Sequence, residues 1–251
     1  MVALVSVLLA MLASAASATS TTTTAPADYR SALTQRLAKE YGDARLAEQV
    51  VAGLGDATIT GLEAKVPAGE VATSPFLAYR PPHVAANKVD SLVVFAFGNR
   101  LGAGGQLLPG PTNEALAKVV EKFVVKHPVP VYAQTEIAQQ LQAAGVPHVT
   151  SIDPVTAADG TVTYLSTAGV AQQVMTKAQA AGEKLGRVGV IGFSDHAVRC
   201  VLTARKAGMT SAAVPTGVTL PTAYDPESNQ TWTRSRAVYL PTDLLGRLAT
   251  L

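Results

Sequence analysis

The apolar positions in the last two thirds of the chain form short unbroken runs, separated by stretches with helical spacing. The run SLVVFAFG at residues 91–98 ends in glycine and is typical of a strand covered on both faces. Similar runs follow: PVYAQ, HVTSI, RVGVIGF and AAVPT. Helical patterns lie between them at residues 112–126, 136–144, 167–183 and 195–207, and a last helix is expected from residue 240 or 241 to 249. This alternation predicts an α/β fold: a three-layer α/β/α, Rossmann-like domain with a mostly parallel sheet.

The pattern before residue 90 is different. Large apolar side chains recur every four residues from Tyr29 to Tyr41, and the helical spacing continues to Val51, so extra N-terminal helices are expected. Residues 59–84 hold four prolines and no clear period, which favours a linker or a wrap over the domain surface. We therefore divide the chain into N-terminal helices and linker at 28–89 and an α/β domain at 90–251.

The first 18 residues have the features of a secretory signal peptide. A short apolar run at residues 2–12 precedes two Ala-Ser-Ala triplets, which suit signal peptidase. No Lys or Arg follows Met1, so an uncleaved membrane anchor is the alternative, although the run is short for a span of about 20 residues. Residues 19–27 form a Thr-rich polar spacer. We expect a secreted or extracytoplasmic protein.

Composition excludes several classes of function. The 251 residues are 48% hydrophobic and 15% charged, which suits a large core and not a disordered chain. The net charge of +2 comes without a basic run, so no nucleic-acid partner is expected. Cys200 is the single cysteine and the four histidines are scattered, so the spacing predicts no metal site. The sequence does not identify a cofactor.

Ligand sites in parallel sheets lie outside the carboxyl ends of the strands, and this rule selects the first candidates. Gly98 and Asn99 follow the first strand and open a loop rich in glycine and proline, which Thr112 or Asn113 ends by starting a helix. The loop lacks the dinucleotide fingerprint and the P-loop motif. Glu136 lies in the first turn of the next helix, where the helix dipole alone favours an acidic residue; the functional alternative is that it binds a ligand hydroxyl or ammonium.

A second candidate corner is GVIGFSDHAVRC. Ser194 or Asp195 is expected to cap the helix, and His196 and Arg199 share one helix face. Consecutive Ser, Asp and His cannot form a catalytic triad, and no Gly-x-Ser-x-Gly motif exists, so an ordinary serine hydrolase is excluded. A histidine at a helix N-terminus beside an arginine is expected to be neutral. Such a pair suits phosphate or carboxylate binding, or proton transfer; the alternative is a surface histidine with a solvated arginine.

These residues resemble a known family. The stretch GFSDHAVRCVLTARKAG is similar to the His-x-x-Arg signature of the YdcF/SanA/ElyC-like proteins, catalogued as domain of unknown function 218. DSLVVFAFGNRL…GPTNEALAKVVEKF, TEIAQQLQAAGV and TVTYLSTAGVAQQVMTKAQ look like further family segments in the same order. Among the departures, Gly169-Val170-Ala171 stands where Glu-Asn-Ala is expected, and Gln134-Thr135 replaces a Ser-Gly-Gly strand end. The resemblance implies a Rossmann-like fold and a membrane- or envelope-associated setting, without a settled reaction.

The resemblance also implies that the family's polar positions line one crevice: Gly98, Asn113, Glu136, Thr167, His196 and Arg199. We therefore predict binding of a small anionic, nucleotide-like or phosphorylated molecule, with envelope metabolism as the setting. His196 is the candidate catalytic residue. The candidate ligand-binding residues are Gly98, Asn99, Asn113, Glu136, Thr167, Asp195 and Arg199. The alternative is a non-catalytic binding or scaffold protein of the envelope, with peripheral membrane or envelope association.

Overall fold

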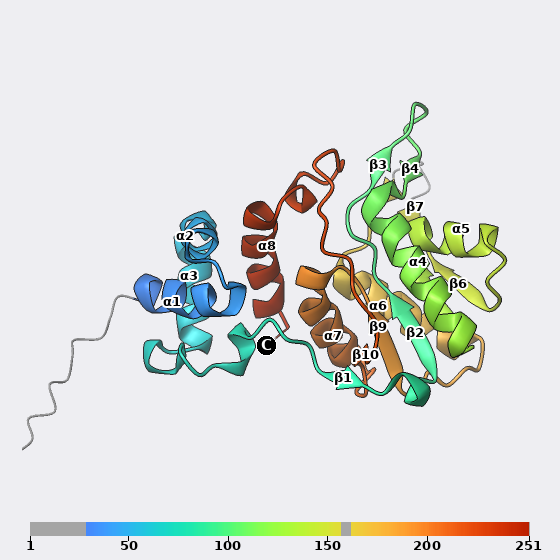
Figure 1. Cartoon of the computed structure of the whole chain (residues 1–251), viewed down its shortest axis with the longest axis horizontal. Helices are drawn as coiled ribbons and strands as arrows, with labels where there is room; N and C mark the ends of the chain where they lie inside the picture. The colour runs from blue at the N-terminus through green and yellow to red at the C-terminus, as the bar shows by residue number, and fades with distance from the viewer. Residues whose placement is uncertain (1–28, 157–161, 251) are drawn as a thin grey trace, which may run out of the picture.

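The computed structural model describes residues 29–156 and 162–250 (Figure 1). The predicted signal peptide and Thr-rich spacer lie outside these residues. No helix in the described ranges is long and apolar enough to cross a membrane.

A parallel four-stranded sheet forms the centre of the α/β part. Its order is β6 (Val149–Ile152), β5 (Val131–Gln134), β2 (Ser91–Val94) and β9 (Val188–Ile191). Ala213 exchanges main-chain hydrogen bonds with Val188 and Val190, which brings β10 (Val214–Pro215) beside β9, and β10 pairs with β1 (His83–Val84). Each of the five predicted runs contains a strand, although β2 ends at Val94 and not at Gly98. The proline-rich segment does wrap the domain, since β1 joins this edge of the sheet.

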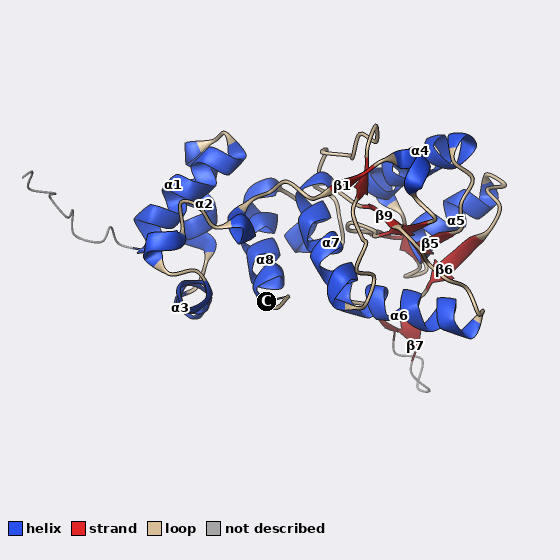
Figure 2. Ribbon diagram, turned by 90° about the horizontal axis from the view of Figure 1, so that it is seen from below, coloured by secondary structure: helices blue, strands red, loops and turns tan. Residues whose placement is uncertain are grey.

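Helices cover both faces of the sheet (Figure 2). Leu92 and Val94 pack with α4 (Gly110–Lys126) and α5 (Thr135–Ala143), whereas Val93 packs with α6 (Thr167–Ala180) and α7 (Ala197–Lys206). Alternate strand residues point to opposite faces, so an unbroken apolar run is what two covered faces require. The predicted α/β/α, Rossmann-like architecture is confirmed.

The N-terminal helices pack around the last helix. These are α1 (Tyr29–Tyr41), α2 (Ala44–Gly53), α3 (Asp56–Lys65) and α8 (Arg236–Leu248). The four-residue repeat of α1 is buried throughout, and one continuous apolar core joins these helices to α4, α5 and the sheet.

Several boundaries were predicted wrongly: α4 starts at Gly110 before the expected Thr112 or Asn113, α6 ends at Ala180 and not at residue 183, and two further differences are larger. The sequence placed residues 59–65 in an irregular segment, but α3 includes them, because burial of Ile59 and Leu62 outweighs the weak apolar period of a helix that contains Gly61. Similarly, α8 starts at Arg236, so Pro241 lies inside the helix instead of at its start.

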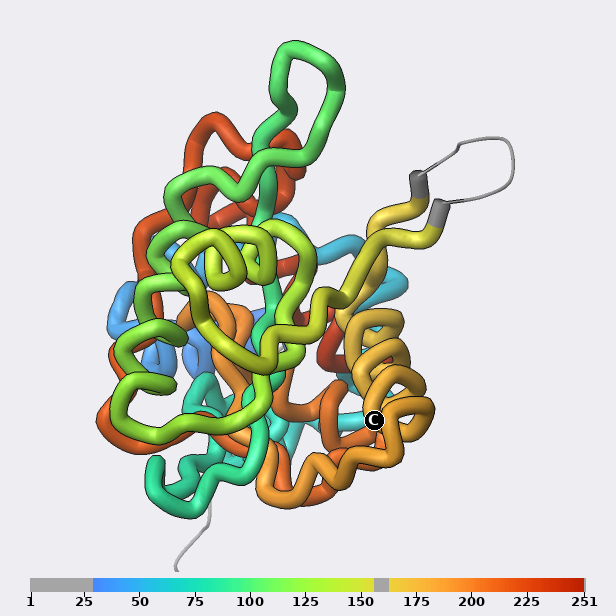
Figure 3. The backbone as a smooth tube through the Cα atoms, turned by 90° about the vertical axis from the view of Figure 1, so that its right-hand side faces the viewer, coloured from blue at the N-terminus to red at the C-terminus, as the bar shows by residue number. Residues whose placement is uncertain are grey.

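Short elements complete the chain. The hairpin of β3 (Arg100–Leu101) and β4 (Leu107–Leu108) projects from the fold, as Figure 3 shows. A second hairpin joins β7 (Val155–Thr156) and β8 (Val162–Thr163). The 3₁₀ turns are η1 (Ala68–Glu70), η2 (Pro75–Leu77), η3 (Ala86–Lys88), η4 (Ser194–His196) and η5 (Thr231–Thr233).

Candidate functional site

A cavity of about 150 Å³ opens where β2 and β9 end. The chain leaves β2 toward α4 on one face and β9 toward α7 on the other, and this switch point is where open α/β sheets bind ligands. We call it the strand-end cavity. Its lining residues are 96–98, Gln134, 164–167, His196, Arg199, Gln230, Trp232, Thr233, Tyr239 and Thr242.

His196 lies in the wall of this cavity and is only 5% exposed. Its ring has edge contacts with Phe95 and Tyr239. Burial, with a smaller contribution from the charge of Arg199, lowers the pKa of His196 to about 4. The imidazole is therefore neutral at physiological pH, as predicted, although the main cause is burial and not the helix terminus. Its Nδ1 atom has no hydrogen-bond partner among the described residues.

Arg199 lies one helical turn beyond His196 and also lines the cavity. Its Nη2 donates to the Tyr239 hydroxyl at 2.9 Å, and its Nε lies 3.1 Å from Oδ1 of Asp243. Nη1 has neither a hydrogen bond nor an ion pair within the described ranges. The predicted alternative of a solvated surface pair does not hold, because both side chains are largely buried.

Asp243 is the functional candidate that the sequence analysis missed. Its carboxylate is completely buried on α8 and lies between two arginines: Arg199 and, 4.0 Å away, Arg247. Arg247 is also buried, and its Nη2 donates to the Phe76 and Ala78 carbonyls while its guanidinium stacks on Tyr79. The spacing Tyr239-x₃-Asp243-x₃-Arg247 puts three polar side chains on one helix face and was the available signal.

Asp195 has a different role from the predicted one. Neither Ser194 nor Asp195 caps a helix: η4 and α7 both start without a side-chain cap. The Asp195 carboxylate instead accepts two hydrogen bonds from Arg236 and one from the Tyr224 hydroxyl. Asp195 does not line the strand-end cavity, and its bonds with Arg236 tie η4, the turn before α7, to the start of α8.

The N-terminus of α6 supplies a further wall. Thr167 lines the cavity, and the preceding Ser166 caps the helix by accepting a hydrogen bond from the Gly169 N–H at 3.1 Å. The N–H groups of Thr167 and Ala168 have no partner within the helix, and the positive end of the helix dipole favours an anion here. The predicted placement of Thr167 near His196 and Arg199 is therefore found.

Gly98 lines the cavity, whereas Asn113 and Asn99 do not. At Gly98 the φ of +71° favours glycine, and a Cβ would lie 2.5 Å from the Ser228 Oγ. Asn113 is fully buried, accepts from the Phe97 N–H and donates to the Gly98 and Pro109 carbonyls. All its hydrogen bonds thus shape the loop after β2, and no polar atom is left for a ligand. The buried Asn99 binds Ser228 and Asn229.

Glu136 is buried behind the cavity. Burial raises the pKa of Glu136, and a hydrogen bond from Tyr164 acts against this rise. Its Oε1 has no partner among the described residues. Tyr164 lines the cavity and accepts a 3.2 Å hydrogen bond from Gln134, whereas Glu136 itself does not line the cavity.

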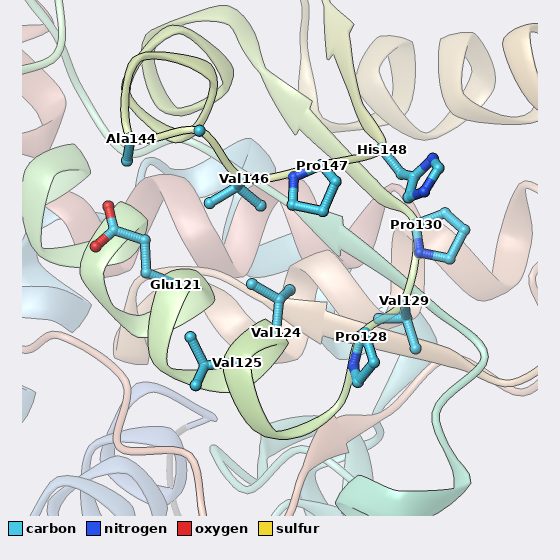
Figure 4. Close-up of a pocket in the computed structure, with 11 residues that line it drawn as sticks. Glu121, Val124, Val125, Pro128, Val129, Pro130, Ala144, Val146, Pro147 and His148 are labelled. Carbon is cyan, nitrogen blue, oxygen red and sulfur yellow. The ribbon is translucent and has the colours of Figure 1, made fainter.

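A larger pocket of about 630 Å³ lies at the other end of the strands from the strand-end cavity. Figure 4 shows Val124 and Val125 of α4 on one side and Val146 and Pro147 on the other. It adjoins the amino ends of β5 and β6, away from the strand ends where ligands bind. Its one acidic residue, Glu121, does not suit an anion, so size alone does not identify the site.

Comparisons with known proteins identify no relative: no family model, curated protein or solved structure matches this chain. Within the described residues, no group of three or more His, Cys, Asp or Glu side chains could hold a metal ion. The groups in the wall of the strand-end cavity that suit an anion are the Arg199 guanidinium, the neutral His196 imidazole and the N-terminus of α6.

Proposed function

We propose that the strand-end cavity binds the phosphate group of a small phosphorylated molecule. One observation supports this most strongly: Arg199 is a largely buried cation with Nη1 unpaired within the described ranges, and it shares the cavity with the N-terminus of α6. Guanidinium groups and helix N-termini are both established phosphate binders. A volume of about 150 Å³ suits a phosphate group and is too small for a whole nucleotide.

The geometry supports binding better than catalysis. Acid–base catalysis at His196 is expected to use a carboxylate beside the histidine. Asp195 is engaged by Arg236, and Glu136 lies behind Tyr164. The nearest carboxylate is Asp243, whose Oδ1 is 3.9 Å from Nδ1 of His196 and already pairs with Arg199. A neutral His196 is still able to accept a proton, so a hydrolase or transferase is the second candidate.

The cellular setting is part of the proposal. The predicted signal peptide favours export, and the resemblance to the YdcF/SanA/ElyC-like family favours the cell envelope. The signal-peptide argument does not involve the cavity, and phosphate binding can be tested independently of location.

Calorimetric titration with inorganic phosphate tests the binding proposal. Wild type and the control Arg205→Met are expected to bind alike, because Arg205 is exposed on the same helix and lies outside the cavity. Arg199→Met is expected to weaken binding at least tenfold, since a hydrogen bond to a charged group contributes about 1.5–3 kcal/mol. Equal affinity in all three proteins would refute the proposal.

A turnover assay separates the two candidate functions. Phosphate release from aryl phosphates is measured for wild type and His196→Gln. Release by wild type that His196→Gln abolishes would establish the enzyme; binding without release by either protein supports a binding module.

A further inference from the structure

A second compartment adjoins the strand-end cavity. It has a volume of about 410 Å³ and lies between α6, α7 and α8. Its lining residues are 166–168, Gln172, Arg199, Thr203, Lys206, Ala207, Gly246, Ala249 and Thr250. Ligand pockets of roughly 300–1,000 Å³ are the usual range, so this compartment is large enough for an organic group.

Three residues line both spaces: Ser166, Thr167 and Arg199. The groups that would hold a phosphate therefore border both spaces. Gly246 keeps the guanidinium in this place, because a Cβ there would lie 2.5 Å from Nη1 and 2.6 Å from Cδ of Arg199. A glycine within a helix lowers its stability relative to alanine, and the close approach of Arg199 explains why glycine stands at this position of α8.

The walls of the second compartment define the chemistry of its occupant. Ala168, Ala207 and Ala249 present methyl groups, and Arg199 and Lys206 are the charged residues that line it in the described part of the chain. Lys206 Nζ donates to the Ala249 carbonyl and sits at the far end, two helical turns from Arg199. Two cations without a carboxylate disfavour a positively charged occupant.

We infer that the ligand is an organic phosphate monoester, whose uncharged, ring-sized organic group occupies the second compartment while its phosphate lies at Arg199. This inference rests on the proposed phosphate binding and adds the class of the molecule. The backbone from Arg199 to Ala207, the residue that directly follows α7, rises roughly 12 Å at about 1.5 Å per residue, which is close to the length of a bicyclic aryl phosphate.

The test compares inorganic phosphate with 2-naphthyl phosphate on three proteins. In Ala207→Trp the indole fills the second compartment. Ala181→Trp is the matched control: Ala181 ends α6 in nearly the same backbone conformation (φ −81°, ψ −5°) as Ala207 ends α7 (φ −76°, ψ −3°), and it lines neither space. Ala249→Trp, on the opposite wall, replaces Ala207→Trp if that variant does not fold.

Wild type and Ala181→Trp are expected to bind 2-naphthyl phosphate at least tenfold more tightly than phosphate. Ala207→Trp is expected to lose this preference and keep its affinity for phosphate. If phosphate binds but naphthyl phosphate binds no better, or if Ala207→Trp keeps the preference, the inference is wrong and the proposed function stands. If neither compound binds wild type, the proposed function itself fails.

Discussion

Nε of Arg199 lies 3.1 Å from Oδ1 of Asp243, and this buried ion pair joins α7 to α8 beside the strand-end cavity. Asp243 also neighbours the buried Arg247, which binds the Phe76 and Ala78 carbonyls. The N-terminal segment thereby contacts the network that holds Arg199. The segment around η2, which the resemblance does not cover, is in this way part of the site's support.

Asp243→Asn is expected to be strongly destabilising. It leaves two buried guanidinium groups without their carboxylate, and breaking a buried pair in this way costs about 3–5 kcal/mol. Urea unfolding measures the change. Asp56→Asn is the control, because Asp56 pairs with Arg30 through a side chain that is 97% exposed. Exposed pairs contribute up to about 1 kcal/mol, so equal losses in both variants would contradict a buried network.

The neutral state of His196 makes stability depend on pH. Its folded pKa of about 4 lies below the ordinary 6.5, so the unfolded chain binds more protons between these values. The stabilisation is complete above pH 6.5 and is lost as the pH falls toward 4, with a slope of at most about 1.4 kcal/mol per pH unit. Unfolding at pH 5, 6 and 7 should show that His196→Gln has a flatter profile than wild type. Parallel profiles would mean that His196 titrates normally.

Glu136 makes stability depend on pH in the opposite direction from His196. Its pKa is raised by burial, so the folded state binds more protons and stability falls as the pH rises above 4.5. Glu136→Gln removes this loss and is expected to be more stable than wild type at pH 7, with the gap narrowing toward pH 4.5. Thermal unfolding across this range measures the gap. Glu48→Gln, at an exposed position of α2, should show no such trend.

The sequence predicted the sheet well because its strands are covered on both faces. The run at residues 91–98 could not be an exposed strand or an amphipathic helix, and β2 is buried at every position. The missed helix α3 shows the limit: Gly61 and the threonines weaken its period, and its stability comes from packing of Leu62 in the shared core.

The site was predicted only in part, for a different reason. The strand-end rule and the helix spacing selected His196 and Arg199, whereas Thr167 was implied only by the family resemblance; all three line the cavity. Neither rule predicts which ion-pair or hydrogen-bond partner a side chain has in the folded protein. Asp195 pairs with Arg236, and Asn113 accepts a hydrogen bond from the loop backbone. Asp243, which pairs with Arg199, lies on α8, more than 40 residues along the chain.

Gly246→Ala tests whether the glycine positions Arg199. The new methyl group would displace the guanidinium, so phosphate affinity should fall about tenfold, the size expected for one charge-assisted hydrogen bond. Gly61→Ala is the control, because Gly61 is also helical but its nearest neighbour is Leu248 in the core. Calorimetry measures both affinities. An unchanged affinity in Gly246→Ala would show that Arg199 does not need this position.

The most direct test of phosphate binding uses the four histidines as reporters. Their ring NMR signals are followed while inorganic phosphate is added at fixed ionic strength. His196 lies in the strand-end cavity, and the other three lie outside it. The account predicts a saturable shift and a raised pKa for His196 alone, because a bound anion favours the charged imidazole, and neither change in Arg199→Met. Phosphate binding at this cavity would be contradicted if the His196 signal does not shift on adding phosphate, or if it shifts equally in Arg199→Met.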